Sequence, residues 1–470
     1  MSKLLIAGQW VAGDHSEVLV DCYSGEPYGE MAVASARQVD EAVAAAAQTA
    51  KTIKLTPHER YQILMRSAEL LQERSAKLLE NMIAETGFPK VDGENEIRRC
   101  IQTLQLSAEE SRRLVGEIIP LEATPGLTNR MGFTVLVPRG VVCAITPYNS
   151  PLNVVAHKIA PALAGGNVVI LKPSELAPLS AVALCEILID AGLPPKCISL
   201  LHGPGASIGR ALLDDSRINF YTFTGSTRVG REIQQAAGLR GTQLELGSIA
   251  STIVLEDANQ PLAIKKVVAA GFRKAGQVCT SVQRVLIQRS IYEDFVTQLV
   301  AATRQVPYGD PRLPDTVVGP MITMQQAERA ERWVDEAVNR GARVLVGGTR
   351  NRSVFAPTVL VDVPNDARVV CEEVFAPIII AIPFDTLEEA YERANDTPYG
   401  LAAGIFTSDL SIAMKAGLNL QFGGVHINET SSSRVDVMPF GGVKDSGFGR
   451  EGPKYAIREM MEERLVTIAY

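Results

Sequence analysis

Cys279 is the residue of this sequence whose setting most clearly allows chemistry. It ends the run Gly-Gln-Val-Cys that starts at Gly276, after an expected helix and before an apolar strand at residues 285–287. A thiol between a glycine turn and a strand can face a cleft, where it is a strong nucleophile once partly ionised. Free N–H groups of such a turn can also stabilise charge on a bound oxygen. The alternative is a small buried core residue, the commoner place for an arbitrary cysteine.

A carboxylate and an amide elsewhere in the chain could complete this chemistry. Glu245 stands between Leu244 and Leu246, where burial would disfavour its ionised form and suit it as a general base near neutral pH. An ion-paired structural role is the alternative for such a glutamate. Asn149 follows an apolar run, so its amide can face a pocket, although a turn or helix cap would also use it.

An α/β fold with two parallel-sheet domains is expected to position these groups. Near-continuous apolar strands alternate with helical stretches from residue 140 onward, and a second such series starts at residue 251. This pattern is typical of parallel sheets covered by helices on both faces, whose ligand sites lie at the carboxyl ends of the strands. The two domains should meet near residues 245–250.

The segments outside the two α/β series are predicted to form helices and a two-stranded ribbon. Short strands in residues 1–35 should precede three long helices, the second with a capping box at Thr56 and apolar positions that continue to Met82,. Residues 117–138 predict a projecting two-stranded ribbon, which is unstable alone. With a lone C-terminal strand at residues 465–469, it suggests strand exchange between subunits.

Composition limits the possible functions. The 470 residues carry a formal net charge of −7 and no long basic run, which argues against nucleic acid as a partner. Seven scattered cysteines without CxxC pairs predict neither a disulfide framework nor a metal site. The early polar residues and the lack of a long apolar run predict a cytoplasmic protein without a signal peptide or membrane span.

Two strand ends could bind a dinucleotide. Gly225, Ser226 and Gly230 lie where a strand passes into a helix, and the N–H groups and dipole of a helix start suit a phosphate. A tight turn with Ser226 as helix cap is the alternative. Glu175, three residues after Lys172, could accept hydrogen bonds from a ribose diol and repel a 2′-phosphate, although a solvated loop carboxylate is equally compatible with this position.

Seven runs, taken in order, resemble the aldehyde dehydrogenase superfamily along essentially the whole chain. They are Pro-Tyr-Asn-Ser-Pro at 147–151, Lys-Pro-Ser-Glu at 172–175, Phe-Thr-Gly-Ser-Thr at 223–227, Glu-Leu-Gly at 245–247, Gly-Gln-Val-Cys at 276–279, Glu-Val-Phe-Ala-Pro at 373–377 and Pro-Phe-Gly-Gly at 439–442. The chain departs from the family pattern at Ser248 and Ala376, where glycine is usual. Neither departure removes a catalytic group, although both could alter cofactor mobility.

The resemblance implies a Rossmann-like cofactor domain at residues 1–119 and 138–246 and a catalytic domain at 247–440. It also implies a small β oligomerisation ribbon at 120–137 and 455–470, in a homodimer or homotetramer.

The resemblance also implies roles for single residues. Cys279 would attack an aldehyde, with Asn149 and the Cys279 N–H as oxyanion hole, and Glu245 would activate the water that hydrolyses the thioester. The cofactor would be NAD, with NADP possible, and its expected contacts are Tyr148, Lys172, Glu175, Gly225, Ser226, Gly230, Glu373 and Phe375. No metal is expected.

A small hydroxyaldehyde or anionic aldehyde is the expected substrate. Arg99 and Arg434 match regions that line the aldehyde tunnel in the family, and two guanidinium groups would suit an anionic head group. Val278 stands where some relatives that handle anions carry arginine, which argues against a phosphorylated substrate. The runs around Cys279 and Met438 also resemble archaeal enzymes of the lactaldehyde type.

Three other functions are compatible with parts of the sequence. Coenzyme A rather than water could take the acyl group, although Glu245 favours hydrolysis. A non-catalytic dinucleotide-binding protein could share the fold, but it would not need Cys279, Glu245 and Asn149 together. A cysteine hydrolase with a histidine base is the third, and none of the five histidines stands in a recognisable partner motif,.

Overall fold

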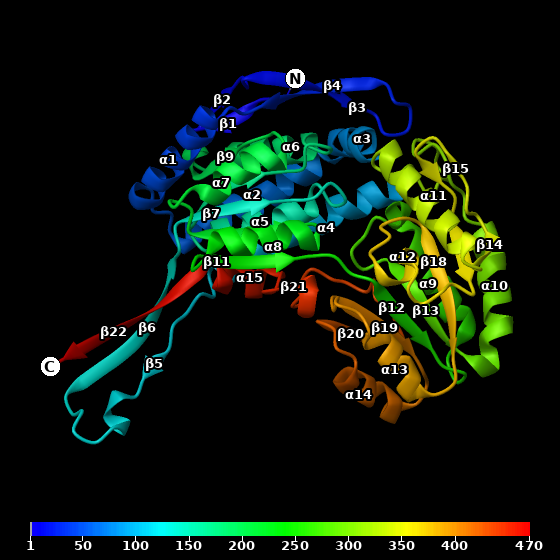
Figure 1. The fold of residues 1–470 in the computed structure, drawn as a ribbon. Coiled ribbons are helices and arrows are strands. Elements are labelled where there is room, and N and C mark those ends of the chain that lie inside the picture. The colour runs from blue at the N-terminus through cyan, green and yellow to red at the C-terminus, as the bar shows by residue number, and fades with distance from the viewer. Residues whose placement is uncertain (1) are drawn as a thin grey trace.

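The computed structural model describes residues 2–470 and has the predicted α/β architecture, with two large sheets side by side (Figure 1). The first sheet has eight strands in the order β2-β1-β9-β8-β7-β10-β11-β21. Its strands are β1 (Leu4–Ile6), β2 (Gln9–Val11), β7 (Val141–Ile145), β8 (Val168–Lys172), β9 (Ile198–Leu200), β10 (Phe220–Thr224), β11 (Gly241–Glu245) and β21 (Gly447–Phe448). Strands β7 to β11 are parallel, as their apolar runs predict,.

Helices cover both faces of the first sheet because successive residues of each buried strand point to opposite faces. Val142 of β7 belongs to the core under α2, α4, α5, α6 and α15, whereas its neighbour Val141 belongs to the core under α1, α7 and α8. These helices are α1 (Ala36–Thr52), α2 (Pro57–Glu73), α4 (Lys90–Ser111), α5 (Asn153–Ala164), α6 (Leu179–Asp190), α7 (Arg210–Asp214), α8 (Thr227–Ala237) and α15 (Pro453–Glu459).

The second sheet has seven strands in the order β14-β17-β18-β13-β12-β19-β20, all parallel except β14. The strands are β12 (Ala250–Val254), β13 (Val282–Gln288), β14 (Arg343–Val346), β17 (Thr358–Val361), β18 (Ile378–Phe384), β19 (Ala402–Phe406) and β20 (Gly424–Ile427). Its helices are α9 (Gln260–Phe272), α10 (Tyr292–Arg304), α11 (Met324–Asn339), α12 (Arg368–Cys371), α13 (Leu387–Asn395) and α14 (Leu410–Asn419).

The expected second helix is two helices. Thr56 forms the predicted capping box with Glu59 at the start of α2, but the helix ends at Glu73 and α3 (Ser75–Thr86) follows. Arg74 between them has φ −97° and ψ 9°, outside the helical region. The apolar spacing continues across this break to Met82, which is why the pattern alone predicts one helix.

The C-terminal strand is paired within its own chain, so the expectation of a lone strand was wrong. Strand β22 (Met461–Ala469) runs antiparallel to β6 (Arg130–Pro138), and β5 (Ile118–Ile119) lies on the other side of β6. The resulting three-stranded sheet projects from the body of the molecule (Figure 1). Exchange between subunits is therefore not needed to pair this strand.

Smaller elements complete the described chain. A hairpin of β3 (His15–Val20) and β4 (Pro27–Val33) lies near the N-terminus, and β15 (Arg350–Asn351) pairs with β16 (Val354–Phe355). Within residues 2–470, no helix is both long and apolar enough to cross a membrane.

Candidate active site

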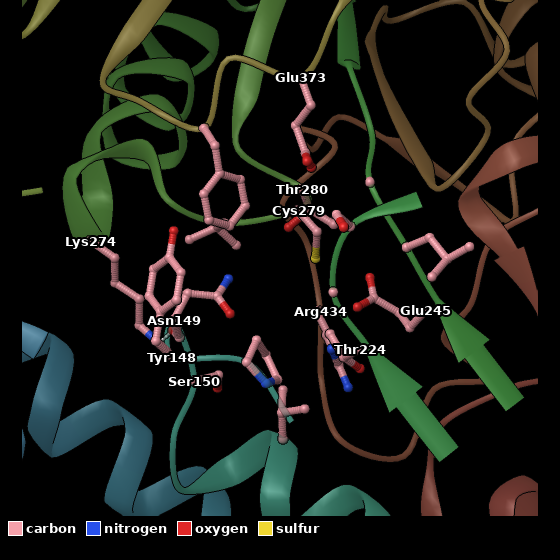
Figure 2. Close-up of a pocket in the computed structure, with 18 of the residues that line it drawn as sticks. Tyr148, Asn149, Ser150, Thr224, Glu245, Lys274, Cys279, Thr280, Glu373 and Arg434 are labelled. Atoms are coloured by element: carbon pink, nitrogen blue, oxygen red, sulfur yellow. Dashed lines mark hydrogen bonds between the residues drawn. The ribbon is translucent and has the colours of Figure 1, made fainter. Parts of the chain in front are cut away.

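A cavity of about 400 Å³ contains Cys279 and lies at the carboxyl ends of β7, β10 and β11. Figure 2 shows Asn149, Glu245 and Glu373 arranged around the Cys279 thiol. Thr224, Gly225 and Ser226 line the same cavity from the first sheet, and Phe375 lines it from the second-sheet side. The cavity therefore brings together residues that are as far apart in the sequence as Asn149 and Glu373.

A strained turn presents Cys279 to this cavity. After α9, Lys274, Ala275 and Gly276 all take left-handed backbone conformations, with φ of 51°, 53° and 68°. A Cβ atom on Gly276 would lie 2.1 Å from the carbonyl oxygen of Ala376, so only glycine fits. The buried Gln277 side chain accepts a hydrogen bond from the Ile322 N–H at 3.0 Å and donates to the Lys274 carbonyl at 3.2 Å. The half-buried cysteine is thus held by a turn with little freedom,.

Asn149 and the cysteine turn are bonded to each other. The Asn149 Nδ2 group donates to the Gln277 carbonyl at 2.8 Å. In the other direction, the buried Lys274 Nζ donates to the Asn149 carbonyl at 2.9 Å and to Glu96 at 2.8 Å. These bonds fix the asparagine amide beside the nucleophile turn, where an oxyanion donor would have to stand.

Glu245 ends β11 and faces Cys279. It is 3% exposed, and its Oε1 atom has no hydrogen-bond partner. Burial, together with repulsion from Glu451, raises the pKa of Glu245 to about 7. Burial and the adjacent Glu245 also raise the pKa of the Cys279 thiol well above its usual range. At neutral pH the site therefore holds a protonated thiol beside a partly ionised carboxylate, which is the arrangement of a nucleophile and its base.

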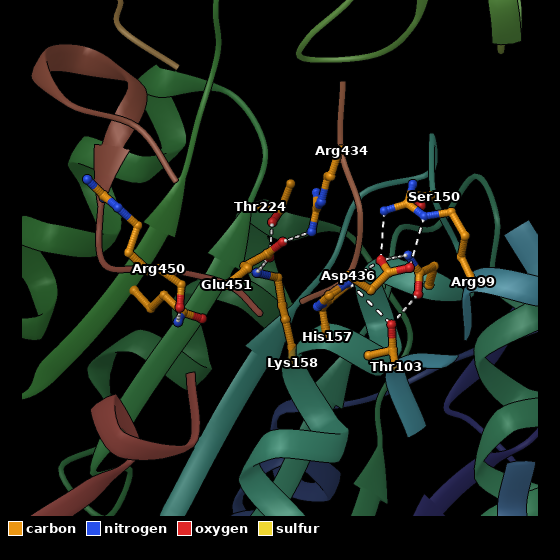
Figure 3. Close-up of polar contacts among 12 residues, drawn as sticks. Arg99, Thr103, Ser150, His157, Lys158, Thr224, Arg434, Asp436, Arg450 and Glu451 are labelled. Carbon is orange, nitrogen blue, oxygen red and sulfur yellow. Dashed lines mark hydrogen bonds and ion pairs between the residues drawn. The ribbon is translucent and has the colours of Figure 1, made fainter. Parts of the chain in front are cut away.

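A buried charge network around Glu451 (Figure 3) acts on Glu245. Glu451 accepts hydrogen bonds from Lys158 Nζ at 2.9 Å and from Arg434 Nη2 at 2.7 Å. Burial opposes ionisation of Glu451, but the two cations hold its pKa well below the usual range. Glu451 therefore stays charged and contributes to the raised pKa of Glu245.

The two arginines proposed from the sequence have different surroundings. Arg99 pairs with Asp436 through two bonds of 2.7 and 3.2 Å, and Asp436 also bonds to His157 and Asn153 (Figure 3). Arg434 lies with its Cζ atom 3.8 Å from the Phe440 ring centroid, and its buried Nε has no partner. Both line the cavity that contains Cys279.

Arg273, like Arg329, also lines the cavity and was missed in the sequence. It directly follows α9, six positions before Cys279, and its Nη2 donates to Ser432 Oγ at 2.7 Å. Arg99, Arg273 and Arg434 also line a second hollow that adjoins the first, together with Asn95, Arg98, Gln102, Ser432, Val435 and Asp436. The only sequence signal for Arg273 was the basic pair Arg273-Lys274 before the cysteine turn. Such a pair does not show where the Arg273 side chain points.

The expected cofactor residues fall into two groups. Gly225, Ser226, Glu373, Phe375 and Tyr148 line the cavity of Cys279. Tyr148 meets Phe375 edge-on, with ring centroids 6.2 Å apart. Glu373 accepts a bond from the Ser248 N–H at 3.0 Å, and burial raises its pKa to about 7.

The remaining cofactor residues lie outside this cavity, along the first sheet. Lys172 ends β8 and lies 3.5 Å from Glu175, the two atoms being Nζ and Oε2. Gly230 lets α8 approach Leu246, because a Cβ there would be 2.4 Å from a Leu246 methyl carbon. Ser226 caps α8 by accepting the Val229 N–H at 3.4 Å, so the capping alternative holds, and the helix start remains open to a phosphate.

These residues fit a dinucleotide that runs from β8 toward Cys279. Two buried oxygen atoms near these residues have no hydrogen-bond partner. Glu245 Oε1 belongs to a residue that lines the cavity, and Ser248 Oγ belongs to the residue whose N–H bonds to Glu373. Gly225 carries no side chain at the cavity wall, and the N-terminus of α8 points its free N–H groups there.

Comparison with known proteins gives one consistent result. The family model described as the aldehyde dehydrogenase family matches residues 10–466. A 3-sulfolactaldehyde dehydrogenase of Priestia aryabhattai is 44% identical over 465 residues, which cover 99% of this chain and 97% of the relative. A lactaldehyde dehydrogenase of Methanococcus aeolicus is 37% identical and covers 99% of both chains.

A solved structure shares the fold. The glyceraldehyde-3-phosphate dehydrogenase of Methanocaldococcus jannaschii, crystallised with NADP, superposes with a TM-score of 0.93 at 37% identity. The match covers 97% of this chain and 100% of the neighbour.

Proposed function

The chain belongs to the aldehyde dehydrogenase family and is an NAD(P)-dependent oxidoreductase. We propose that it oxidises a small anionic hydroxyaldehyde to its acid by way of a Cys279 thioester. The observation that carries this proposal is the single cavity that Cys279, Glu245 and Asn149 share with four arginines, Arg99, Arg273, Arg329 and Arg434. Nucleophile, base and amide would serve the aldehyde carbon, and the arginines would hold a negative group at its other end.

The first step is attack by Cys279 on the aldehyde carbon. Because the thiol is protonated in this environment, attack requires a proton acceptor, and Glu245 with its pKa of about 7 can take that proton,. The oxygen of the resulting thiohemiacetal needs donors, which the Asn149 amide and the Cys279 N–H can supply once Asn149 exchanges its bond to Gln277 for the substrate,.

The second step is oxidation followed by hydrolysis. When bound, the nicotinamide ring supplies a hydride acceptor. Glu373 and Phe375 can hold the nicotinamide end of the cofactor beside the thiol, whereas Lys172 and Glu175 can hold its adenosine end,. Once Glu245 has released to solvent the proton that it took from Cys279, it can remove a proton from the water that attacks the thioester carbon. The C–S bond then breaks, the Cys279 sulfur takes up a proton, and the carboxylic acid leaves.

We propose NAD as the preferred cofactor. Glu175 is partly exposed at the end of β8, where its carboxylate can accept bonds from a ribose diol and repel a 2′-phosphate,. The neighbour crystallised with NADP shows that the fold also accepts that form. A higher kcat/KM with NADP than with NAD would contradict the preference.

We also propose how the chain is divided into domains and how it assembles. Residues 1–119 and 138–246 form the cofactor domain, residues 247–440 the catalytic domain, and residues 120–137 and 455–470 an oligomerisation ribbon in a cytoplasmic homodimer or homotetramer. Support comes from the projecting three-stranded sheet, whose side chains Ile118, Met131 and Leu465 are exposed. An apolar projection of this kind is typical of an interface.

A panel of aldehydes tests the proposed function. We expect purified protein to reduce NAD with an anionic aldehyde at a higher kcat/KM than with neutral lactaldehyde, and to release the free acid without coenzyme A. Acid formation that depends on coenzyme A would favour the acylating reaction instead. If Arg434→Ala left the KM of every anionic aldehyde unchanged, the anionic substrate class would be wrong.

A further inference from the structure

Helix α4 bonds to both segments that carry the reacting groups. Asp92 and Glu96 lie four residues apart on this helix and therefore on one face of it,. The Asp92 carboxylate accepts the Lys274 N–H of the cysteine turn at 3.0 Å, and Glu96 accepts from Lys274 Nζ at 2.8 Å. The other Glu96 oxygen accepts from Ser150 Oγ at 2.6 Å and from the Asn153 N–H at 2.8 Å. One helix thus holds the cysteine turn against the loop that precedes α5.

Lys274, Asn149 and Gln277 close a ring of hydrogen bonds across these two segments. Lys274 Nζ donates to the Asn149 carbonyl at 2.9 Å, and Asn149 Nδ2 donates to the Gln277 carbonyl at 2.8 Å. Gln277 Nε2 completes the ring by donating to the Lys274 carbonyl at 3.2 Å. The proposed reaction opens the ring at one place, because Asn149 exchanges the Gln277 carbonyl for the substrate oxygen. The bond from Lys274 then still holds the Asn149 backbone.

Lys274 occupies this place under two constraints. Its side chain is 6% exposed, and burying an ammonium is costly unless it is paired. Its backbone is left-handed, with φ 51° and ψ 34°, and such strain in a residue other than glycine clusters at functional sites. Burial opposes ionisation of Glu96, but the Lys274 charge and the hydrogen bonds to Glu96 hold its pKa below the usual value. The pair is therefore ionic at neutral pH.

We propose that Lys274 is a positioning residue for the oxyanion site: its ammonium, held by Glu96, keeps the Asn149 backbone in place while the Asn149 amide bonds to the substrate oxygen. Lys274 acts through Asn149 and not on the head group of the substrate. The inference rests on the proposed oxyanion role of Asn149 and adds the residue that keeps this donor beside the Cys279 N–H.

The substitution Lys274→Met tests this role, because it keeps the length of the side chain and removes the ammonium. The measurement is the rate of NADH formation in the first turnover, with saturating lactaldehyde and with saturating 3-sulfolactaldehyde. We expect this rate to fall about tenfold to hundredfold with both aldehydes, since a small misplacement of a catalytic group has an effect of this size. KM should change less than about threefold for either aldehyde, because uniform binding is untouched.

A double-mutant cycle with Asn149→Ala separates positioning from a general structural effect. If Lys274 acts through Asn149, Lys274→Met should slow the Asn149→Ala enzyme by less than about twofold, because the interaction is already lost. The alkylation rate of Cys279 by iodoacetamide should stay near that of the wild type in Lys274→Met. Equal factors in both backgrounds, or a parallel loss of alkylation, would make Lys274 structural and the inference wrong.

A second variant covers the case in which Lys274→Met folds poorly. The single substitution leaves the Glu96 carboxylate buried without its cation, whereas Lys274→Met combined with Glu96→Gln removes both charges together. We expect the combined variant to unfold at a temperature closer to that of the wild type and still to show the slow first turnover. A first turnover at the wild-type rate would overturn the inference.

Lys266 offers a matched control. Its Nζ also bonds to a carboxylate, that of Glu429, and to a backbone carbonyl, that of Asn428 at 3.0 Å. Lys266→Met should leave the first turnover unchanged, and a loss equal to that of Lys274→Met would contradict a specific role for Lys274. An Asn149→Ala enzyme with an unchanged first turnover would instead overturn the proposed oxyanion role. A loss in Asn149→Ala without one in folded Lys274→Met would overturn the positioning role alone.

Discussion

Asn149 and Gln277 are joined across 128 residues of sequence by a 2.8 Å hydrogen bond from the asparagine Nδ2 to the glutamine carbonyl oxygen. The bond keeps an amide donor two residues from Cys279 without using the Cys279 N–H. A substrate oxygen needs only to replace the Gln277 carbonyl as acceptor in order to bond to the Asn149 amide and the Cys279 N–H. Such preorganisation is usually a large part of transition-state stabilisation in acyl chemistry.

Asn149→Ala should therefore lower kcat by about 10²–10³-fold, the usual cost of one oxyanion donor. The thiol itself should remain reactive, so alkylation of Cys279 by iodoacetamide should keep a similar rate. Steady-state kinetics and the labelling rate measure the two effects separately. A parallel loss of labelling would mean that the variant has disturbed the cysteine turn rather than the oxyanion site.

Glu245→Gln should stabilise the fold at high pH. The folded-state pKa of Glu245 is raised to about 7, so its ionisation opposes folding. The penalty is absent well below the ordinary glutamate pKa, grows between about pH 4.5 and 7, and is complete above pH 7. We expect the gain in unfolding free energy from the substitution to be about 2 kcal/mol larger at pH 8 than at pH 5. Urea unfolding at both pH values measures it, and an equal gain at both would contradict the raised pKa.

Arg434→Met should shift the pH dependence of turnover upward. Arg434 favours the ionised forms of Glu245 and Cys279, so without it both protons are held more tightly. The profile of kcat against pH, measured with neutral lactaldehyde to exclude effects on head-group binding, should rise at a higher pH in this variant. Arg434→Lys keeps the charge, so the pH midpoint of its kcat profile should stay near that of the wild type. An unshifted midpoint in both variants would show that Arg434 does not set the pKa of Glu245.

Gly276→Ala should abolish activity and destabilise the protein, because the added Cβ meets the Ala376 carbonyl at 2.1 Å and the backbone has φ 68°. Gly417→Ala is the matched control. It lies within α14, where no atom lies within 4 Å of the added Cβ, and alanine there should stabilise by about 0.5–1 kcal/mol. Thermal unfolding and kcat are the measurements. An active Gly276→Ala protein would show that the turn is not constrained as described.

Patterns local in sequence predicted much of this molecule. The parallel strands, the cap at Thr56 and the places of Cys279 and Glu245 at element ends follow from local periodicity and turn chemistry. Long-range pairings could not be predicted in this way. The bonds from Arg99 to Asp436 span 337 residues, so the sequence could not show that this cation is already paired.

The same limit explains the other differences. Strand β22 pairs with β6 across most of the chain, and no local pattern marks a terminal strand as paired in its own subunit. Arg273 was missed because only tertiary structure reveals that its side chain lines the cavity of Cys279. The break at Arg74 falls inside a regular apolar spacing and has no glycine or proline to mark it.

Direct trapping of the Cys279 thioester tests the central claim most directly. The variant Glu245→Gln, incubated with NAD and an anionic aldehyde, should release about one equivalent of NADH per chain and then stop, because hydrolysis has lost its base. This release should be slower than the first turnover of the wild type, because attack by Cys279 has lost the same base. Mass spectrometry should find the acyl group on the peptide that contains Cys279. Continued turnover without a burst, or an intact variant with no acyl group on Cys279, would contradict the account.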